Sequence, residues 1–532
     1  MGFLVGDSNR KPGFRSSSIL FGWQPLPAPE ITRAHIIALA LLPLVLTACG
    51  ATAPPTAGVA PRLDEGVGTV VNDVHSQLNL THVDRIVAPR SVEEIQETIR
   101  QSRKEGKSIS IAGARHAMGG QQSGEGAVLI DMSKMNRVLR FDRTTGLVEA
   151  EAGIEWPGLV DYLVAAQKDV GRAWGIRQKQ TGADRLSLGG GLSANAHGRG
   201  LRLKPIVQDV EDFTLVDSGA QVRRCSRREN PELFRLAIGG YGLFGVIARV
   251  TLRLAPRQKV ERVVEVLDLK NLMPAFDKRI AEGYLYGDFQ YAIDPVSPDF
   301  LKRGVFSCYR PVAASTPIAE GQKELSAENW KELYYLAHTD KTRAFEMYAR
   351  YYLSTSGQVY WSDTHQMGVY IENYHEDLDR RLGSTDKGSE MITEVYVPRG
   401  DLTAFMGEAR DFFRAEGFGP IYGTIRLIEK DDETFLAWAK ERYACVIFNL
   451  HVVRTPQGIE RAAARFRRLI DLAIGHGGSY FLTSHRWATA KQITTCYPQF
   501  PAFLRLKKKY DSSEIFQSDW YRQYRSLADG AP

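Results

Sequence analysis

The chain has 532 residues, of which 43% are hydrophobic and 24% charged, and its formal net charge is +6. This length predicts more than one domain, and the charge content is that of a globular protein. The basic residues form no clustered stripe, so we expect no nucleic-acid partner. The five cysteines form no C-x-x-C pair, which argues against a zinc site, a covalent haem and a disulfide scaffold, and we expect no metal.

An apolar run at residues 36–46 is too short to span a bilayer as a helix but is typical of a signal peptide. The sequence Leu46-Thr-Ala-Cys49 that follows resembles the bacterial lipobox, in which the chain is cut before a cysteine that is then lipidated. We therefore expect a signal peptide at residues 1–49 and a flexible, Pro-rich tether at residues 50–66. The protein would be exported and anchored through Cys49 to a bacterial membrane, facing the periplasm or the cell exterior. The alternative is a buried strand or helix with a chance cysteine.

The segment from residue 87 to residue 115 predicts a strand, a helix and a second strand. Ser91 is a typical N-cap, with Glu94 at the capping-box position, and the apolar residues that follow recur at helical spacing. Residues 107–112 alternate as a strand and lead directly into a glycine-rich loop. Further elements are predicted as strands at 128–131, 147–152 and 246–254, helices at 156–166 and 232–237, and a hairpin of 210–216 with 221–225.

From about residue 257 glycine becomes rare and the sequence predicts a second, α+β domain. Strands such as 391–397 alternate there with helices such as 401–416. Residues 323–352 are predicted to be largely helical and carry many aromatic side chains. We interpret these rings as core, with a lid or a membrane-facing patch as the alternative.

Three segments of the first part are rich in glycine: 113–120, 182–200 and 239–245. Glycines allow backbone N–H groups to turn toward a ligand and to form a nest for a pyrophosphate. The first loop does not follow the pattern G-x-G-x-x-G at the start of a long helix, which disfavours a Rossmann NAD site.

The order of these segments, over residues 87–256, resembles the vanillyl-alcohol-oxidase/p-cresol-methylhydroxylase (PCMH) family of FAD enzymes. The resemblance implies an α+β fold: a PCMH-type FAD-binding domain of two subdomains at 67–256, a substrate or cap domain at 257–480, and a return to the FAD domain at 481–532. It implies FAD as the cofactor. The residues that it assigns to FAD binding are Ala112, Gly113, Ala114, Arg115, His116, Ala117, Gly119, Gln121, Gly182, Asp184, Ser187, Gly190, Asn195, His197, Gly198, Val246 and Ile247.

Many family members attach the flavin covalently through a histidine in the motif Gly-x-Gly-His-Ser. Here the equivalent is Gly113-Ala-Arg-His-Ala117, so His116 occupies the linking position while Arg115 and Ala117 depart from the motif. The resemblance therefore implies a covalent link through His116. The alternative is a histidine that only forms hydrogen bonds in the loop.

The last part of the chain, from about residue 478, is similar to the ends of sugar-oxidising members, namely aldonolactone, alditol and decaprenylphosphoryl-ribose oxidases. Ser484 stands where those members have a lysine. Residues 422–432 resemble the family strand that carries Glu-x-Arg over the flavin ring. Arg426 matches the arginine, whereas Thr424 replaces the glutamate.

Oxidation of an alcohol by a flavin requires a group that takes the hydroxyl proton and a cation that stabilises the reduced flavin. Arg426 is the candidate cation, and His485 or His451 is the candidate base, because histidine titrates near neutral pH. His451 lies on a predicted strand, 445–451, where it alternates with apolar residues. The alternative for this strand is a half-exposed sheet face.

The sequence thus predicts an FAD-dependent oxidoreductase that oxidises an alcohol group of a polyol, sugar or sugar lactone by hydride transfer to flavin N5. The electrons would pass to oxygen or to a membrane or periplasmic acceptor. Three alternatives remain open: a flavin-dependent reductase of a C=C bond, a flavin-binding lipoprotein that has lost catalysis, and a lipoprotein without flavin.

Overall fold

The structure, a computed structural model, describes residues 69–168, 171–368, 371 and 374–529. The signal peptide, the lipobox and the tether predicted at residues 1–66 lie outside the described residues. No helix among the described residues combines the length and the apolar character needed to cross a membrane.

The first sheet has three parallel strands in the order β3-β5-β4, with the helix α1 connecting β3 to β4. Ser91 caps α1 by accepting a hydrogen bond from Glu94 N–H at 3.2 Å, and Ile95 and Ile99 are fully buried on its inner face. The predicted strand, helix and strand are confirmed. The elements are β3 (Arg85–Val87), α1 (Val92–Lys104), β4 (Ile109–Ala112) and β5 (Val128–Asp131), preceded by the short pair β1 (Val70–Val71) and β2 (Thr81–His82).

The second sheet has five antiparallel strands in the order β10-β9-β11-β7-β6. It contains the predicted hairpin, which is confirmed with Val222 opposite Val216. The strands are β6 (Val138–Asp142), β7 (Leu147–Glu151), β9 (Val210–Val216), β10 (Val222–Ser226) and β11 (Val246–Arg253), and β8 (Trp174–Gly175) pairs separately with β12 (Ala255–Pro256). The helices of this region are α2 (Trp156–Ala166), α3 (Leu188–Ser193) and α4 (Pro231–Ala237).

An antiparallel sheet of eight strands follows, in the order β16-β13-β15-β14-β18-β19-β17-β20. Ile447 of β19 lies opposite both Glu394 of β17 and Thr424 of β18, so these side chains share one face. The strands are β13 (Lys259–Asp268), β14 (Tyr286–Tyr291), β15 (Arg303–Pro311), β16 (Val359–Trp361), β17 (Gly388–Pro398), β18 (Tyr422–Ile428), β19 (Tyr443–Val453) and β20 (Ser479–Tyr480).

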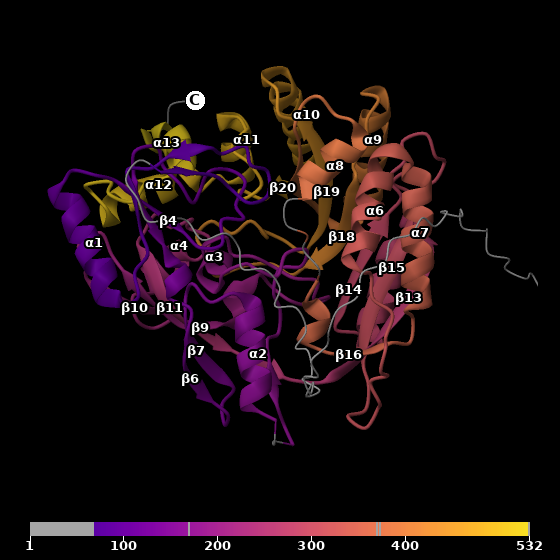
Figure 1. The fold of residues 1–532 in the computed structure, drawn as a ribbon, viewed down its shortest axis with the longest axis horizontal. Coiled ribbons are helices and arrows are strands. Elements are labelled where there is room, and N and C mark those ends of the chain that lie inside the picture. The colour runs from indigo at the N-terminus through magenta and orange to yellow at the C-terminus, as the bar shows by residue number, and fades with distance from the viewer. Residues whose placement is uncertain (1–68, 169–170, 369–370, 372–373, 530–532) are drawn as a thin grey trace, which may run out of the picture. The chain divides into compact units, whose positions relative to one another are not determined.

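Helices pack beside this sheet, and Figure 1 shows α6 and α7 next to each other along β13 and β15. The predicted helical region 323–352 forms these two helices, which are separated at Asp340 because its side chain caps α7. Tyr348 is buried against Val264 and Val305, which confirms the core interpretation for this ring. The helices are α5 (Leu272–Ala281), α6 (Ala327–Thr339), α7 (Lys341–Ser354), α8 (Tyr374–Leu382), α9 (Leu402–Ala415) and α10 (Pro456–Gly475).

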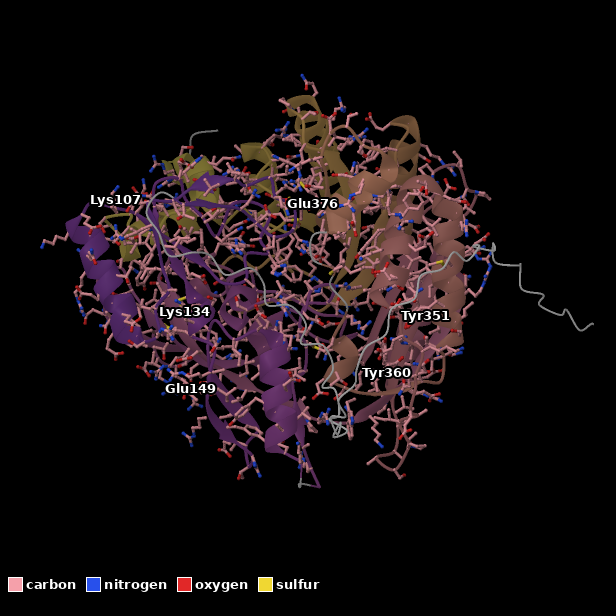
Figure 2. All side chains as sticks on the ribbon, viewed as in Figure 1. Lys107, Lys134, Glu149, Tyr351, Tyr360 and Glu376 are labelled. Carbon is pink, nitrogen blue, oxygen red and sulfur yellow. The ribbon has the colours of Figure 1, made fainter. Side chains whose placement is uncertain are left out.

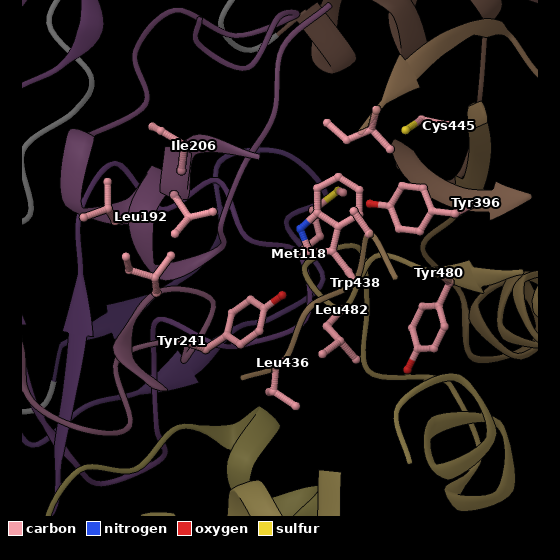
Figure 3. Close-up of a cluster of buried hydrophobic side chains, with 14 of the residues drawn as sticks. Met118, Leu192, Ile206, Tyr241, Tyr396, Leu436, Trp438, Cys445, Tyr480 and Leu482 are labelled. Atoms are coloured by element: carbon pink, nitrogen blue, oxygen red, sulfur yellow. The ribbon is translucent and has the colours of Figure 1, made fainter. Parts of the chain in front are cut away.

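The last helices are α11 (Ala490–Cys496), α12 (Phe500–Tyr510) and α13 (Asp519–Tyr524). Between α12 and α13 the chain pairs with β4: Ile109 N–H donates to Ile515 O at 2.6 Å, and Gln517 N–H donates to Ile109 O at 2.8 Å. One hydrophobic core joins the two sheets of the N-terminal part, the eight-stranded sheet and the last helices. Figure 3 shows Tyr241, Trp438, Tyr396 and Leu482 within it.

Candidate active site

A cavity of about 470 Å³ lies between the glycine-rich segments and one face of the eight-stranded sheet. All three glycine-rich segments contribute to its lining, and so do strands β14, β17, β18 and β19. Cavities of this size typically hold small molecules or cofactors. Among the residues assigned to FAD or to catalysis from the sequence, those that line it are Gly113, Ala114, Arg115, His116, Ala117, Gln121, Gly182, Ser187, Gly190, His197, Ile247 and Arg426.

The first two glycine-rich segments approach each other, and the second also approaches the chain after β7, so closely that side chains would fill the space between them. A Cβ at Gly113 would lie 2.0 Å from Ser187 Oγ, and one at Gly189 would lie 2.8 Å from Ala152 Cβ. Arg115 adopts a left-handed backbone conformation with φ of 57°, which turns the first loop. The lining contributed by these segments contains no carboxylate. Exposed backbone and the absence of negative charge suit the diphosphate of FAD.

His116 lines the cavity at the position expected for a covalent link. Its Nε2 lies 3.0 Å from Arg185 O, and its ring packs edge-on against His75 with the centroids 5.2 Å apart. Burial holds the pKa of His116 well below its usual value, so the ring is neutral at pH 7. A neutral imidazole is the form that can bond to carbon. The covalent link itself stays a prediction.

Arg426 reaches the cavity from β18 and is 8% exposed. Its Nε has no hydrogen-bond partner among the described residues, and the same holds for Asn449 Oδ1 on β19 and for Asp288 Oδ1 and Gln290 Oε1 on β14. We call these four cavity-lining residues the polar row. Buried polar atoms without partners are rare in native proteins and cost about 1–3 kcal/mol each, so a row of them at a cavity indicates a polar ligand.

Two buried carboxylates from β17 also line the cavity. Glu394 Oε1 lies 2.6 Å from His197 Nε2, while His197 Nδ1 lies 3.0 Å from Gly198 O. Because a carbonyl oxygen can only accept, Nδ1 donates to Gly198 O, and Nε2 faces the carboxylate of Glu394. This brings a carboxylate–imidazole pair to the wall of the cavity, near Arg426.

Glu390 is the second of these carboxylates and is held by two histidines. His338 Nε2 and His451 Nδ1 each lie 3.0 Å from Glu390 Oε1. Burial opposes ionisation of the carboxyl, but the two hydrogen bonds hold the pKa of Glu390 well below its usual range. Burial alone would lower the pKa of His451. The hydrogen bond and the charge of Glu390 outweigh burial, so the pKa of His451 is raised; the charge of Asp379 adds to this rise, and that of Lys341 opposes it. His451, a base candidate from the sequence, thus contacts the cavity residue Glu390 but does not itself line the cavity.

His485, the other base candidate, does not line the cavity either, and its placement corrects that expectation. Its ring packs against Phe466 and Trp487 at centroid distances of 4.3 and 5.3 Å, and its Nδ1 accepts a hydrogen bond from Trp487 N–H at 3.0 Å. Burial lowers the pKa of His485 to about 3, with Arg467 adding to the effect. The neighbouring Ser484 lines the cavity instead.

Other residues assigned to FAD from the sequence lie behind the cavity lining and hold the loops. Asp184 forms an ion pair with Lys179, with Oδ1 and Nζ 2.8 Å apart. The side-chain amide of Asn195 donates a hydrogen bond to Asp431 Oδ2 at 2.8 Å. The residues of this group are Ala112, Gly119, Asp184, Asn195, Gly198 and Val246.

The acidic and amide residues Asp288, Gln290, Glu390 and Glu394 were missed from the sequence. The sequence of β14 contained a usable pattern, because the polar Asp288 and Gln290 are two residues apart among mainly apolar residues; in the structure all six residues of this strand are buried. Polar side chains two apart in a buried strand point to the same face. The pairing of Glu394 with His197 had no local signal, because 197 residues separate them.

Comparisons with known proteins agree with this site. Residues 83–226 match the family model described as an FAD-binding domain. L-gulono-1,4-lactone dehydrogenase of Mycobacterium tuberculosis is 23% identical over 439 residues, which are 82% of this chain and 95% of that protein. L-gulonolactone oxidase of Bos taurus is 28% identical over 37% of this chain and 42% of its own length. Mitochondrial L-galactono-1,4-lactone dehydrogenase of Arabidopsis thaliana is 29% identical over 37% of this chain and 32% of its own length.

The fold, the glycine-rich cavity and these matches define an FAD-dependent oxidoreductase with a PCMH-type FAD-binding domain and an α+β fold. Residues 83–226 therefore form an FAD-binding domain of the p-cresol-methylhydroxylase type, and the chain is similar to aldonolactone dehydrogenases and oxidases.

Proposed function

We propose that this protein oxidises a hydroxyl group of a polyol, sugar or sugar lactone by hydride transfer to flavin N5. The polar row carries the proposal, because Asp288, Gln290, Arg426 and Asn449 offer unpaired donors and acceptors on the cavity face of three neighbouring strands. A polyhydroxylated ligand both donates and accepts, so it can pair with all of them. The names of the relatives, which act on sugar lactones, support the same substrate class.

The bound flavin supplies the hydride acceptor, and the residues around it supply the rest of the chemistry. The side chain of Arg426 places a positive charge at the cavity wall, where it favours negative charge on the reduced cofactor. Glu394, paired with His197, is our candidate for the group that takes the hydroxyl proton. The pair replaces His485, whose ring lies in an aromatic cluster.

The test is an anaerobic titration of the FAD-loaded protein with L-gulono-1,4-lactone, L-galactono-1,4-lactone and glucitol, followed by the oxidised-flavin absorbance. We expect at least one of them to bleach the flavin, and admission of air would then show whether oxygen takes the electrons. Glu394→Gln should slow bleaching, whereas Glu429→Gln should not, since Glu429 pairs with Arg399 and does not line the cavity. If none of these compounds bleaches the flavin, the substrate class is wrong, and reduction by an external donor with an activated C=C compound as acceptor would favour the reductase instead.

We further propose that the protein is exported and lipid-anchored through Cys49, which rests on the apolar run and the lipobox-like residues. Expression of the full chain in a bacterium should place it in the membrane fraction, and mass spectrometry should find a lipidated Cys49 at the N-terminus. Cys49→Ser should keep the leader uncut. A soluble protein that still contains residues 1–48 would contradict the proposal.

A further inference from the structure

Two further arginines, Arg199 and Arg262, line the cavity. Arg262 is on β13, and the sheet order β13-β15-β14-β18 places three strand spacings between it and the strand of Arg426. At about 4.8 Å a spacing, the two strands are about 14 Å apart. The cavity therefore extends well beyond the region that a small lactone ring would occupy beside the flavin.

Arg262 is fixed by neutral groups alone. Its Nε donates to Tyr309 Oη and its Nη1 donates to Thr355 Oγ1, both at 2.9 Å. The rings of Tyr309 and Tyr352 lie 5.3 Å from its guanidinium carbon, and that of Tyr360 lies at 4.8 Å; Figure 2 labels Tyr360 on β16. No carboxylate in the described part of the chain forms an ion pair with Arg262. The tyrosines orient the guanidinium but leave its charge without a counter-ion.

Arg199 is also poorly compensated. Its side chain is 12% exposed, its Nη1 lies 3.5 Å from Asp288 Oδ2, and its Nη2 donates to His365 O. Its Nε has no hydrogen-bond partner among the residues that the structure describes. Burial holds the pKa of His365 well below its usual value, so that ring adds no charge at pH 7. Among the described residues, Asp288 is thus the one carboxylate that forms an ion pair with either of the two guanidinium groups.

An uncompensated charge in a low-dielectric site is costly, and an anion that enters the site removes this cost. Guanidinium groups recognise carboxylate and phosphate oxygens in particular, because their N–H donors match the geometry of both. We propose that the substrate carries an anionic group, a carboxylate or a phosphate, which Arg199 and Arg262 bind. The inference rests on the proposed function and narrows its substrate class to acidic sugars or polyols.

The first experiment compares probes with the same six-carbon chain and different end groups: glucitol, gluconate and glucitol 6-phosphate. Their dissociation constants are measured by calorimetry on the FAD-loaded protein, so that the cofactor occupies its own part of the cavity. A charge-assisted hydrogen bond at a buried site predicts that one anion binds roughly tenfold or more tightly than glucitol. The anion that gains identifies the group as carboxylate or phosphate. Equal affinities for all three probes would overturn the proposal.

Variants then locate the effect. Arg262→Gln should remove the advantage of the anion and leave glucitol binding unchanged, whereas Asp288→Asn should increase the advantage, because it removes the competing carboxylate. Arg257→Gln is the matched control: Arg257 has the same 12% side-chain exposure as Arg199 and lies against Trp361, but it pairs with Asp363 and does not line the cavity. If Arg262→Gln fails to fold, the opposite shift expected for Asp288→Asn still decides. A loss of the anion advantage in Arg257→Gln alone would contradict the assignment.

The two proposals can fail separately. If a lactone or polyol bleaches the flavin but anions bind no better than glucitol, the oxidation stands and the anion site is wrong. If anions bind better through Arg262 and no alcohol bleaches the flavin, the anion site stands and the proposed reaction is wrong.

Discussion

The contact between Gly113 and Ser187 joins the first two flavin loops and predicts the outcome of a double-mutant cycle. A Cβ at position 113 would lie 2.0 Å from Ser187 Oγ and 3.0 Å from Ser187 Cβ, so Gly113→Ala must force the loops apart. Overpacking of this kind costs about 1–3 kcal/mol. If the whole cost falls on the FAD-bound state, binding of FAD weakens roughly 5- to 150-fold.

Ser187→Gly removes both clashing atoms and should restore binding in the double variant. Its own cost is small: Ser187 Oγ caps α3 by accepting from Gly190 N–H at 3.3 Å, and glycine at an N-cap costs only a few tenths of a kcal/mol. The two substitutions should therefore be strongly non-additive.

The assay is a titration with FAD, followed by quenching of flavin fluorescence, on protein produced with limited riboflavin. Gly400→Ala is the control, because a Cβ there would meet nothing within 4 Å. Wild-type affinity in Gly113→Ala, or a double variant as weak as Gly113→Ala alone, would refute the close approach of the loops.

Three further outcomes are expected. Arg426→Gln should slow flavin reduction about 10²- to 10³-fold without lowering the melting temperature, as stopped-flow absorbance and thermal unfolding would show, and a normal rate would remove Arg426 from the reaction. Although burial opposes it, Glu390 raises the pKa of His451, so this stabilisation is complete below pH ~6.5 and is lost as the pH rises through the raised pKa. The fall in melting temperature from pH 6 to pH 8 should therefore be smaller in Glu390→Gln than in the wild type. The control Glu408→Gln, which removes the partner of His476, should behave like the wild type. Equal falls in Glu390→Gln and the wild type would refute the linkage. Flavin should stay with the acid-precipitated wild-type protein and be released from His116→Ala; flavin that leaves both disproves the covalent link.

The sequence was informative where the interactions are local. The helix α1 follows from its own cap and apolar spacing, because Ser91 and Glu94 are three residues apart. The flavin loops could be located because glycine marks the places where backbone turns or approaches another segment closely, as Gly113 does.

The acid–base groups could not be placed in this way, because they depend on contacts between distant segments. Glu394 meets His197 only after the eight-stranded sheet has packed on the second glycine-rich segment. Conversely, His485 is a residue type that often serves as a catalytic base, but in the structure Phe466 and Trp487 pack against its ring. Periodicity assigns a side chain to a face and does not tell whether that face lies against solvent, ligand or other rings.

The pairing of residues 515–517 with β4 has a consequence for the biosynthesis of the protein. The strand that leads into the first flavin loop exchanges hydrogen bonds with Ile515 and Gln517 through Ile109, so its edge stays open until residues 515–517 have been translated. N-terminal parts of a chain generally begin to fold while synthesis continues. Here the strand beside the nucleotide cradle gains its last partner only after residues 515–517 have been made, so uptake of FAD should be sensitive to any tag or truncation that disturbs these three residues.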